Sequence, residues 1–344
     1  MSKEGTLVSI VQPTSSKKAV MRAGKELAEC YDRGCALQAD ALDVLNNWRL
    51  SHSYPLEKIR LYLEQNAKEV DSKALMGQRI KRVPSIVGKL NRFPNMRLDR
   101  MQDLGGCRAV VSSIDDVYRV VGKLKSTRFM HVLKNEKDYI EDPKESGYRS
   151  YHMVYSYQNK KYEKLNGLQI EMQIRTVVQH SWATAVEVVG AFTAQSLKSS
   201  QGNERWLDFF KLVSHYFQEL EKGRRYRTAP EDLKTLFEEL NVNRFVHACA
   251  VTANHIDKEN HQWASYFLME LNPQEGHINV TSYPTNRLKQ AGEDYLAAER
   301  RCKDIVGAEA ALVSTNDLDN LRNAYPNYFA DTRTFMHNLG RVLG

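Results

Sequence analysis

The stretch that most constrains the fold is residues 167–175, which read GLQIEMQIR. Apolar and polar residues alternate through it, which is the period of a β-strand that buries one face. The two faces consist of Leu168, Ile170, Met172 and Ile174 on one side and Gln169, Glu171, Gln173 and Arg175 on the other. The second face is more polar than a plain exterior face requires, although a solvated face explains it about equally well.

Helices and strands interleave around this strand. CRAVVSS, FMHVL and YHMVYSYQ read as short strands, and IDDVYRVVGKLKS reads as an amphipathic helix. Apolar residues recur at helical spacing in residues 17–72, after Pro84, and in the two stretches TVVQHSWATAVEVVGAFTAQSL and WLDFFKLVSHYFQELEKG. Strands interleaved with helices and flanked by long helices predict an α+β domain that ends near Arg227.

A second, smaller unit is expected after the linker-like stretch GRRYRTAPEDL. ASYFLMEL and HINVTSY predict a hairpin around NPQEG, with Gly276 in the turn. Two helices, AGEDYLAAERRCKDIV and DTRTFMHNLGRVL, follow on either side of a short strand-like ALVS. We therefore expect an N-terminal helical region at 1–75, the α+β domain at 76–228 and a small α+β module at 229–344.

Charge divides along the same boundary. Residues 1–228 carry 38 Lys and Arg against 26 Asp and Glu, whereas residues 229–344 carry 11 against 16. A basic body with an acidic C-terminal module suggests an anionic ligand for the body, and a module that covers it. Two solvated faces without any partner account for the charges equally well.

The chain is expected to be cytoplasmic and to stay off the membrane. No apolar run approaches the roughly 20 residues needed to span a bilayer. The first residues, MSKEGTLVSIVQPTSSKK, lack the apolar core of a signal peptide. The cysteines are odd in number and show no tight pairing, so we expect reduced thiols at Cys30, Cys35, Cys107, Cys249 and Cys302.

Basic residues gather in QRIKRVPSIVGKL, where Arg79, Lys81, Arg82 and Lys89 stand close to the expected start of a helix. Cations at such a place can grip a polyphosphate. A solvated basic helix face is the commoner explanation for the cluster taken alone.

Two carboxylates stand out as candidate metal ligands. Asp103 precedes the pair Gly105–Gly106 at the expected start of a strand. Mg²⁺ usually takes one or two protein carboxylates together with substrate phosphates, so Asp103 fits such a site, although a turn-capping role fits it too. Glu171, on the polar strand face, would add a metal ligand or a general base for a hydroxyl nucleophile.

The stretch KDYIEDPKESGYRSYH has the residue types of a loop that holds a nucleotide. Lys137 and Lys144 suit phosphates, Tyr148 suits stacking on a base, and His152 suits a hydrogen bond to a phosphate or sugar. A strand edge with a preceding turn is the simpler alternative. No GxxxxGK[ST] or GxGxxG motif occurs, so neither a P-loop nor a dinucleotide fold is expected.

In this order, QRIKRVPSIVGKL, MQDLGGCRAVV, KDYIEDPKESGYRSYH and IEMQIRTVVQHSWATAVE resemble the synthetase domain of the RelA/SpoT family, over about residues 75–190. The resemblance implies a nucleotidyltransferase-like domain with a mixed β-sheet. It also implies a pyrophosphokinase that uses Mg²⁺ to transfer the β,γ-pyrophosphate of ATP to a ribose 3′-hydroxyl. No hydrolase-type metal cluster precedes the region, so synthesis without degradation is expected.

The resemblance also implies residue roles. Asp103 matches the Mg²⁺ ligand, and Glu171 matches the acidic residue assigned to metal binding and to activating the 3′-hydroxyl. The ATP-binding positions of the family match Arg79, Lys81, Ser85, Lys89 and Arg108. The acceptor-binding positions match Lys137, Lys144, Tyr148, His152, Gln173 and His180, with Tyr148 stacking on the acceptor base.

The family contains more than one acceptor. Some members convert GDP or GTP to ppGpp or pppGpp, toxic small synthetases modify the 3′ CCA end of tRNA, and some relatives use adenine nucleotides. We expect tRNA here, because polyanion binding scales with basic contacts, and such residues occur near both ends of the body at Lys17, Lys18, Arg22, Lys25, Arg224, Arg225 and Arg227. The alternatives are alarmone synthesis from GDP or GTP, and a non-catalytic binding protein.

In position and size, the acidic module at 229–344 resembles the antitoxin-like portion of fused CapRel toxin–antitoxin proteins. Those proteins are held inactive by their own C-terminal domain until a phage protein binds it. The resemblance implies a translation-inhibiting toxin for phage defence, autoinhibited by its C-terminal module, with a phage-encoded partner.

Overall fold

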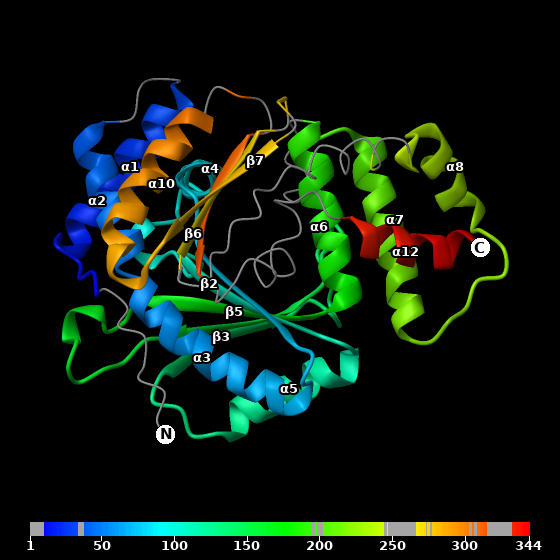
Figure 1. Ribbon diagram of the computed structural model, residues 1–344, viewed down its shortest axis with the longest axis horizontal. Helices are drawn as coiled ribbons and strands as arrows, with labels where there is room; N and C mark the ends of the chain where they lie inside the picture. Colours follow the sequence, from blue (N-terminus) through cyan, green and yellow to red (C-terminus); the bar gives the residue numbers. More distant parts are fainter. Residues whose placement is uncertain are drawn as a thin grey trace.

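The computed structural model describes residues 10–33, 38–193, 197, 202–243, 246, 266–272, 274–275, 277–302, 305, 308–314 and 332–344. The described residues form one mixed β-sheet with helices packed against it (Figure 1). The predicted α+β class with a mixed sheet is therefore confirmed. Within these ranges, none of the helices is both long and apolar enough to cross a membrane.

The sheet has eight strands in the order β3-β4-β5-β2-β1-β8-β6-β7. β2 and β5 run parallel, and every other neighbouring pair is antiparallel. The strands are β1 (Leu75–Ile80), β2 (Gly105–Val111), β3 (Val132–Asp138), β4 (Tyr151–Ser156), β5 (Gln169–Thr176), β6 (Tyr266–Asn272), β7 (His277–Tyr283) and β8 (Glu309–Ser314).

The α-helices of the described part are α1 (Lys17–Asp32), α2 (Ala39–Leu50), α3 (Ser53–Val70), α4 (Val83–Arg92), α5 (Ile114–Ser126), α6 (Val177–Phe192), α7 (Glu204–Glu221), α8 (Glu231–Glu239), α10 (Leu288–Cys302) and α12 (Arg333–Leu343). Side-chain caps set the starts of α1, α5, α6 and α7. Ser113 caps α5 by accepting from the amide of Asp116, and Thr176 and Gln179 form a capping box at α6.

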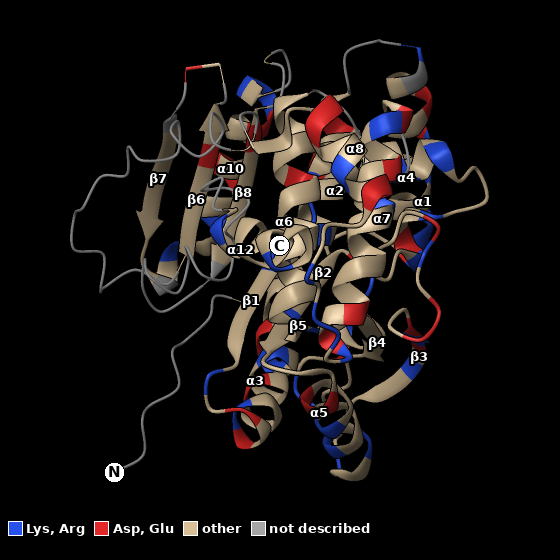
Figure 2. Cartoon of the chain, turned by 90° about the vertical axis from the view of Figure 1, so that its right-hand side faces the viewer, with Lys and Arg blue, Asp and Glu red and all other residues tan. Residues whose placement is uncertain are grey.

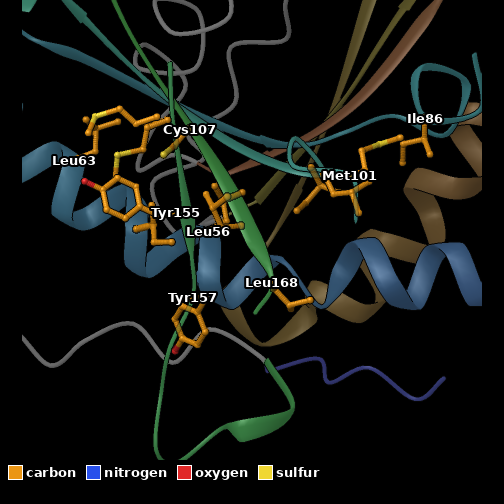
Figure 3. Packing of buried hydrophobic residues seen from close by; sticks show 14 of the residues in the cluster. Leu56, Leu63, Ile86, Met101, Cys107, Tyr155, Tyr157 and Leu168 are labelled. Carbon is orange, nitrogen blue, oxygen red and sulfur yellow. The ribbon is translucent and has the colours of Figure 1, made fainter. Parts of the chain in front are cut away.

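The main core lies under one face of the sheet, where α3 and α5 pack (Figure 1). Leu56 and Leu63 of α3 point toward Cys107 of β2 and Tyr155 of β4, and all four are buried (Figure 3). The apolar face predicted for β5 contributes to this core, since Ile170, Met172 and Ile174 are fully buried. The opposite face of β5 is thus left for its polar residues.

A second core joins α6, α7, α8 and α12. Phe210 and Phe217 of α7 contact Phe335 of α12, with ring centroids 6.2 and 5.7 Å apart. Tyr148, which precedes β4, belongs to the same apolar cluster. The last helix of the chain therefore packs against the two helices that follow the polar-faced strand.

The C-terminal segment is built from the predicted hairpin, helix and short strand, but its strands extend the central sheet. β8 pairs with β1 through Arg79 and Val313, and β6 pairs with β8 along its length. On one face of these strands, Leu268 and Leu312 pack against Tyr295 of α10. Open strand edges attract partners, and β8 covers the edge that β1 would otherwise present.

Three details differ from the expectations. β1 was not predicted, because QRI was read with the helix that follows it. β4 is buried on both faces, not half-buried, because Tyr139, Tyr148 and Glu171 contact His152 on the face away from the main core. Cys30 is disulfide-bonded, so a reduced thiol was wrong there; the odd cysteine count does not exclude a single bridge. Cys107 and Cys302 are free thiols, whereas Gly276, Cys35 and Cys249 lie outside the described residues.

Candidate active site

Cross-strand register gathers the predicted site residues on one face of the sheet. Side chains of directly paired residues point to the same face. One row runs across β1, β2 and β5 as Arg79, Gly106 and Glu171, and another runs across β2, β5, β4 and β3 as Arg108, Gln173, His152 and Lys137. The predicted ATP-side and acceptor-side residues therefore meet on the same surface, opposite the main core.

Asp103 is the centre of the predicted ATP side. Its Oδ2 lies 2.9 Å from the Nζ of Lys81, just after β1, and 2.9 Å from the Nζ of Lys89 in α4. Burial opposes ionisation of this carboxyl, but the two ammonium groups outweigh it and hold the Asp103 pKa at about 2. The residue is therefore a carboxylate at any physiological pH.

The other oxygen of Asp103 is a candidate ligand for the expected Mg²⁺. Oδ1 is buried and has no hydrogen-bond partner within the described part of the chain. A bare buried carboxylate oxygen is costly unless it receives a cation or a donor. Together with substrate phosphates, one such oxygen is the ligand set that Mg²⁺ prefers, so Asp103 fits the metal.

Glu171 stands on the adjoining strand with both oxygens engaged. Oε1 lies 3.0 Å from Nδ1 of His152, and Oε2 accepts a hydrogen bond of 2.7 Å from Nε2 of Gln173. Burial raises the pKa of Glu171 and so does the charge of Asp103, but His152 and Gln173 prevail and lower it. The charge of Asp103 opposes the ionisation of Glu171, so the two carboxylates belong to one electrostatic cluster.

A tight turn precedes β4 and is pinned to α7. The amide of Gly147 donates to the carbonyl of Lys144 at 2.7 Å, and Gly147 has φ of 87°. A side chain there would also meet Ser214 of α7 at 2.9 Å, so only glycine fits. Arg149 anchors the same turn through a buried ion pair with Glu221 of α7, 2.5 Å from Nη1 to Oε2.

Tyr148 does not present a free ring face in this structure. It is 5% exposed, its hydroxyl lies 2.9 Å from Nε2 of His152, and its ring packs against Trp182 of α6. The Nζ of Lys144 lies 5.0 Å from the ring centroid. Stacking on a base as expected would require Lys144 to move off the ring.

Tyr139 is a neighbour that the sequence reasoning did not single out. Its ring meets the edge of His152 at 5.2 Å, and the Nζ of Lys144 lies 4.4 Å from its centroid. The residue is half-buried, so more of it is accessible than of Tyr148. Its position in KDYI, two residues after Lys137, was the available signal.

Arg175 was also missed. It is buried at the end of β5, and its Nη2 lies 2.7 Å from Nδ1 of His180 in α6. Burial, helped by the nearby charge of Arg108, lowers the Arg175 pKa to about 9. His180 is buried beneath it, so it serves to support Arg175 in this structure more directly than to meet a ligand.

The remaining predicted residues lie around this centre. Ser85 of α4, Arg79 and Arg108 are half-buried, and Lys137 and Lys144 are exposed. Desolvation lowers the Lys144 pKa, and the charges of Glu171, Lys89, Asp103 and Lys81 all act on it. Lys144 therefore belongs electrostatically to the cluster around the two carboxylates.

The basic residues expected to contact tRNA fall into two separate groups. Lys17, Lys18 and Arg22 are exposed on α1, whereas Arg224 and Arg225 are exposed beyond α7. α1 and the end of α7 lie at opposite ends of the long axis (Figure 1). Acidic and basic residues are mixed on α7 and α8 (Figure 2), so the two groups do not form one basic surface.

The fold and site define an α+β domain in which two carboxylates, Asp103 and Glu171, lie among lysine, arginine and histidine side chains. Residues 78–189 match the region found in RelA/SpoT proteins. This part of the chain is a RelA/SpoT-family synthetase domain, as the ordered motifs predicted.

Relatives of known name agree with this. The chain is 36% identical over 108 residues to GTP pyrophosphokinase YjbM of Bacillus subtilis, and 34% identical over 111 residues to YwaC of the same organism. Each match covers 31% of this chain and 51% or 52% of the relative, so the chain spans about half their length. The crystal structure of B. subtilis small alarmone synthetase 1 with pppGpp superimposes with a TM-score of 0.43 at 26% identity, covering 50% of this chain and 90% of that one.

Proposed function

We propose that the protein is an ATP-dependent pyrophosphokinase that transfers pyrophosphate to a ribose 3′-hydroxyl. The observation that carries the proposal is that Asp103, held by Lys81 and Lys89, directly precedes β2, and that β2 pairs with the strand carrying Glu171. Cations around one carboxylate suit a nucleotide triphosphate with its metal, and a second carboxylate suits a hydroxyl nucleophile.

In the reaction, the acceptor 3′-oxygen attacks the β-phosphorus of ATP. The bond between that phosphorus and the oxygen bridging to the α-phosphate breaks, and AMP leaves. Lys81 and Lys89 stabilise the charge that develops on the phosphate oxygens. Asp103 and Glu171 would hold Mg²⁺, which would supply positive charge against the same phosphate oxygens.

Glu171 is the group that takes the proton of the hydroxyl. Its lowered pKa keeps it ionised at neutral pH, and the contacts with His152 and Gln173 fix the direction of its oxygens. A base must lie within hydrogen-bond reach of the proton it removes, and the adjoining loop at Tyr139–Tyr148 is where the acceptor would enter.

GDP or GTP is the acceptor that the relatives favour, since both are named GTP pyrophosphokinases. Tyr139 and Tyr148 offer rings for a purine beside Lys144. Lys137, on the same sheet face as His152, would receive the acceptor phosphates.

The 3′ CCA end of tRNA is a second candidate acceptor. The observation in its favour is that exposed Arg224 and Arg225 follow Glu221, the residue that pins the acceptor loop through Arg149. A polyanion approaching the loop would meet these cations. Lys17, Lys18 and Arg22 lie elsewhere and would contact only a large acceptor.

The C-terminal segment is proposed to regulate the site, as in a fused toxin–antitoxin answering a phage-encoded trigger. Its contacts support a direct influence on the ATP side. β8 pairs with β1 at Arg79, and Glu309 of β8 forms an ion pair of 2.6 Å with Arg82.

The acceptor can be decided with γ-labelled ATP and three acceptors offered separately: GDP, GTP and deacylated tRNA. We expect label in the guanine nucleotides, the acceptors that the names of the relatives favour. Label only in tRNA would assign the toxin activity. If the protein binds ATP but none of the three acceptors becomes labelled, the proposed function is refuted and a non-catalytic binding protein is favoured.

A further inference from the structure

A buried ion pair connects the C-terminal segment to the helical region before the synthetase domain. Arg49 at the end of α2 and Glu299 in α10 lie 2.9 Å apart from Nη2 to Oε2, with side chains 0% and 4% exposed. The guanidinium also lies 4.5 Å from the ring centroid of Tyr295. Burial disfavours the charge of Arg49, but Glu299 and Tyr295 outweigh it and raise its pKa.

The same two side chains hold the backbone between β1 and α4. Glu299 Oε1 accepts a hydrogen bond of 2.6 Å from the amide of Val83, the first residue of α4. Arg49 Nη1 donates to the carbonyl of Lys81 at 3.3 Å. The pair therefore fixes both sides of Arg82, in a turn where a helix N-terminus would otherwise leave an amide unsatisfied.

This turn sets the position of the two lysines on the ATP side. Lys81 stands in it, and Lys89 lies in the helix that it starts. Both ammonium groups converge on Asp103 Oδ2 at 2.9 Å. A shift of the turn would move these cations relative to each other and to Asp103.

We infer that Glu299 is a positioning residue for ATP: through Arg49 and the Val83 amide it holds the Lys81–Lys89 clamp in its binding geometry. The inference rests on the proposed function. A buried ion pair often adds little net stability compared with apolar residues of similar size, whereas its hydrogen bonds to two backbone groups define a geometry. The C-terminal segment thereby becomes part of the ATP site without touching ATP.

The first test is Glu299→Gln in the full chain, measured by calorimetric binding of the non-hydrolysable analogue α,β-methylene-ATP. We expect the Kd to rise by about tenfold to a hundredfold, because small misplacements of binding groups have effects of that size. Glu270→Gln is the matched control, since it removes an exposed ion pair with Arg301 of the same α10. The control should bind the analogue as the wild type does.

The double variant Arg49→Met/Glu299→Leu separates positioning from folding. It leaves no uncompensated buried charge, so it should fold with a melting temperature near that of the wild type. It also lacks both hydrogen bonds to the turn. The Kd for the analogue should therefore still be about tenfold or more above that of the wild type. Recovery of analogue binding together with stability would overturn the inference.

The remaining outcomes are distinct. If the wild type binds the analogue and transfers pyrophosphate while Glu299→Gln keeps wild-type affinity, only this inference fails. If Glu299→Gln binds more tightly, the segment restrains the clamp, and the inference is contradicted. If the folded wild type does not bind the analogue, the proposed function and the inference fall together.

Discussion

His152 and Glu171 meet across adjacent strands, with Nδ1 of the imidazole 3.0 Å from Oε1 of the carboxylate. The other ring nitrogen of His152 lies 2.9 Å from the hydroxyl of Tyr148. A line of contacts thus runs from the turn that precedes β4 to the carboxylate expected to take a proton. The loop proposed to hold the acceptor is thus in contact with Glu171 through His152.

The first prediction concerns Glu171→Gln. The amide keeps the size and a hydrogen-bonding oxygen but cannot accept the proton of the hydroxyl. We expect the turnover number to fall by about 10² to 10⁴, the usual range for a general base, with ATP-analogue affinity changed far less. Rapid-quench measurement of label transfer checks this. An unchanged turnover number would remove Glu171 from proton transfer.

The second prediction concerns the pH dependence of stability. The Asp103 pKa is about 2 in the folded protein against an ordinary 3.8. This carboxylate therefore stabilises the fold above about pH 4, and that stabilisation is lost as the pH falls toward 2. The difference corresponds to about 2 kcal/mol. Because burial also lowers the pKa of Lys81, the net gain of the cluster is smaller.

Urea unfolding at pH 6, 4 and 3 measures the effect. Asp103→Asn should be less stable than the wild type at pH 6, with the gap between them narrowing by pH 3. An equal gap at all three pH values would contradict the assignment of this ion cluster.

The third prediction concerns the anchor of the acceptor turn. Glu221→Gln breaks the buried pair with Arg149 and weakens the bond from the Thr176 hydroxyl. Leaving the buried Arg149 unpaired should lower the free energy of unfolding by about 3 to 5 kcal/mol. The KM for the acceptor should also rise, while the KM for ATP stays nearly constant. Glu219→Gln, which loses only the looser contacts with Lys222 and Arg224, is the control. Equal changes in both KM values would argue against a role confined to the loop.

The fourth prediction concerns α12. Phe335 is 1% exposed between Phe210 and Phe217, so Phe335→Ala should lower the free energy of unfolding by about 3 to 5 kcal/mol.

Deleting residues 229–344 as a whole would remove this contact, the β8 partner of β1 and Glu299. We therefore expect the remaining residues 1–228 to lose their fold, which circular dichroism would show. Simple autoinhibition would instead leave residues 1–228 folded and more active.

The sequence predicted the centre of the site because its residues lie in short motifs with strong local patterns. The alternation in β5 placed Glu171 and Gln173 on the polar face, and Gly105–Gly106 marked the start of β2 after Asp103. Helix spacing found the described helices of the first 72 residues. These are features of neighbouring residues, which a single sequence records directly.

Other features depended on contacts between distant segments. Nothing local shows that β8 pairs with β1, or that Glu299 reaches Val83 across 216 positions. Tyr148 was expected to be open because its motif resembles a stacking site, but packing against α6 buries it. The roles of Arg149 and Arg175 likewise arise from partners in α7 and α6, which the motifs do not name.

The most direct test of the central claim is the mass and stoichiometry of the products formed from ATP and GDP or tRNA. The account predicts an acceptor heavier by one pyrophosphate, attached at the 3′ position, with one AMP released for each transfer, and neither product with Asp103→Asn. Release of ADP with a single phosphate transferred, or AMP and free pyrophosphate without a modified acceptor, would contradict it.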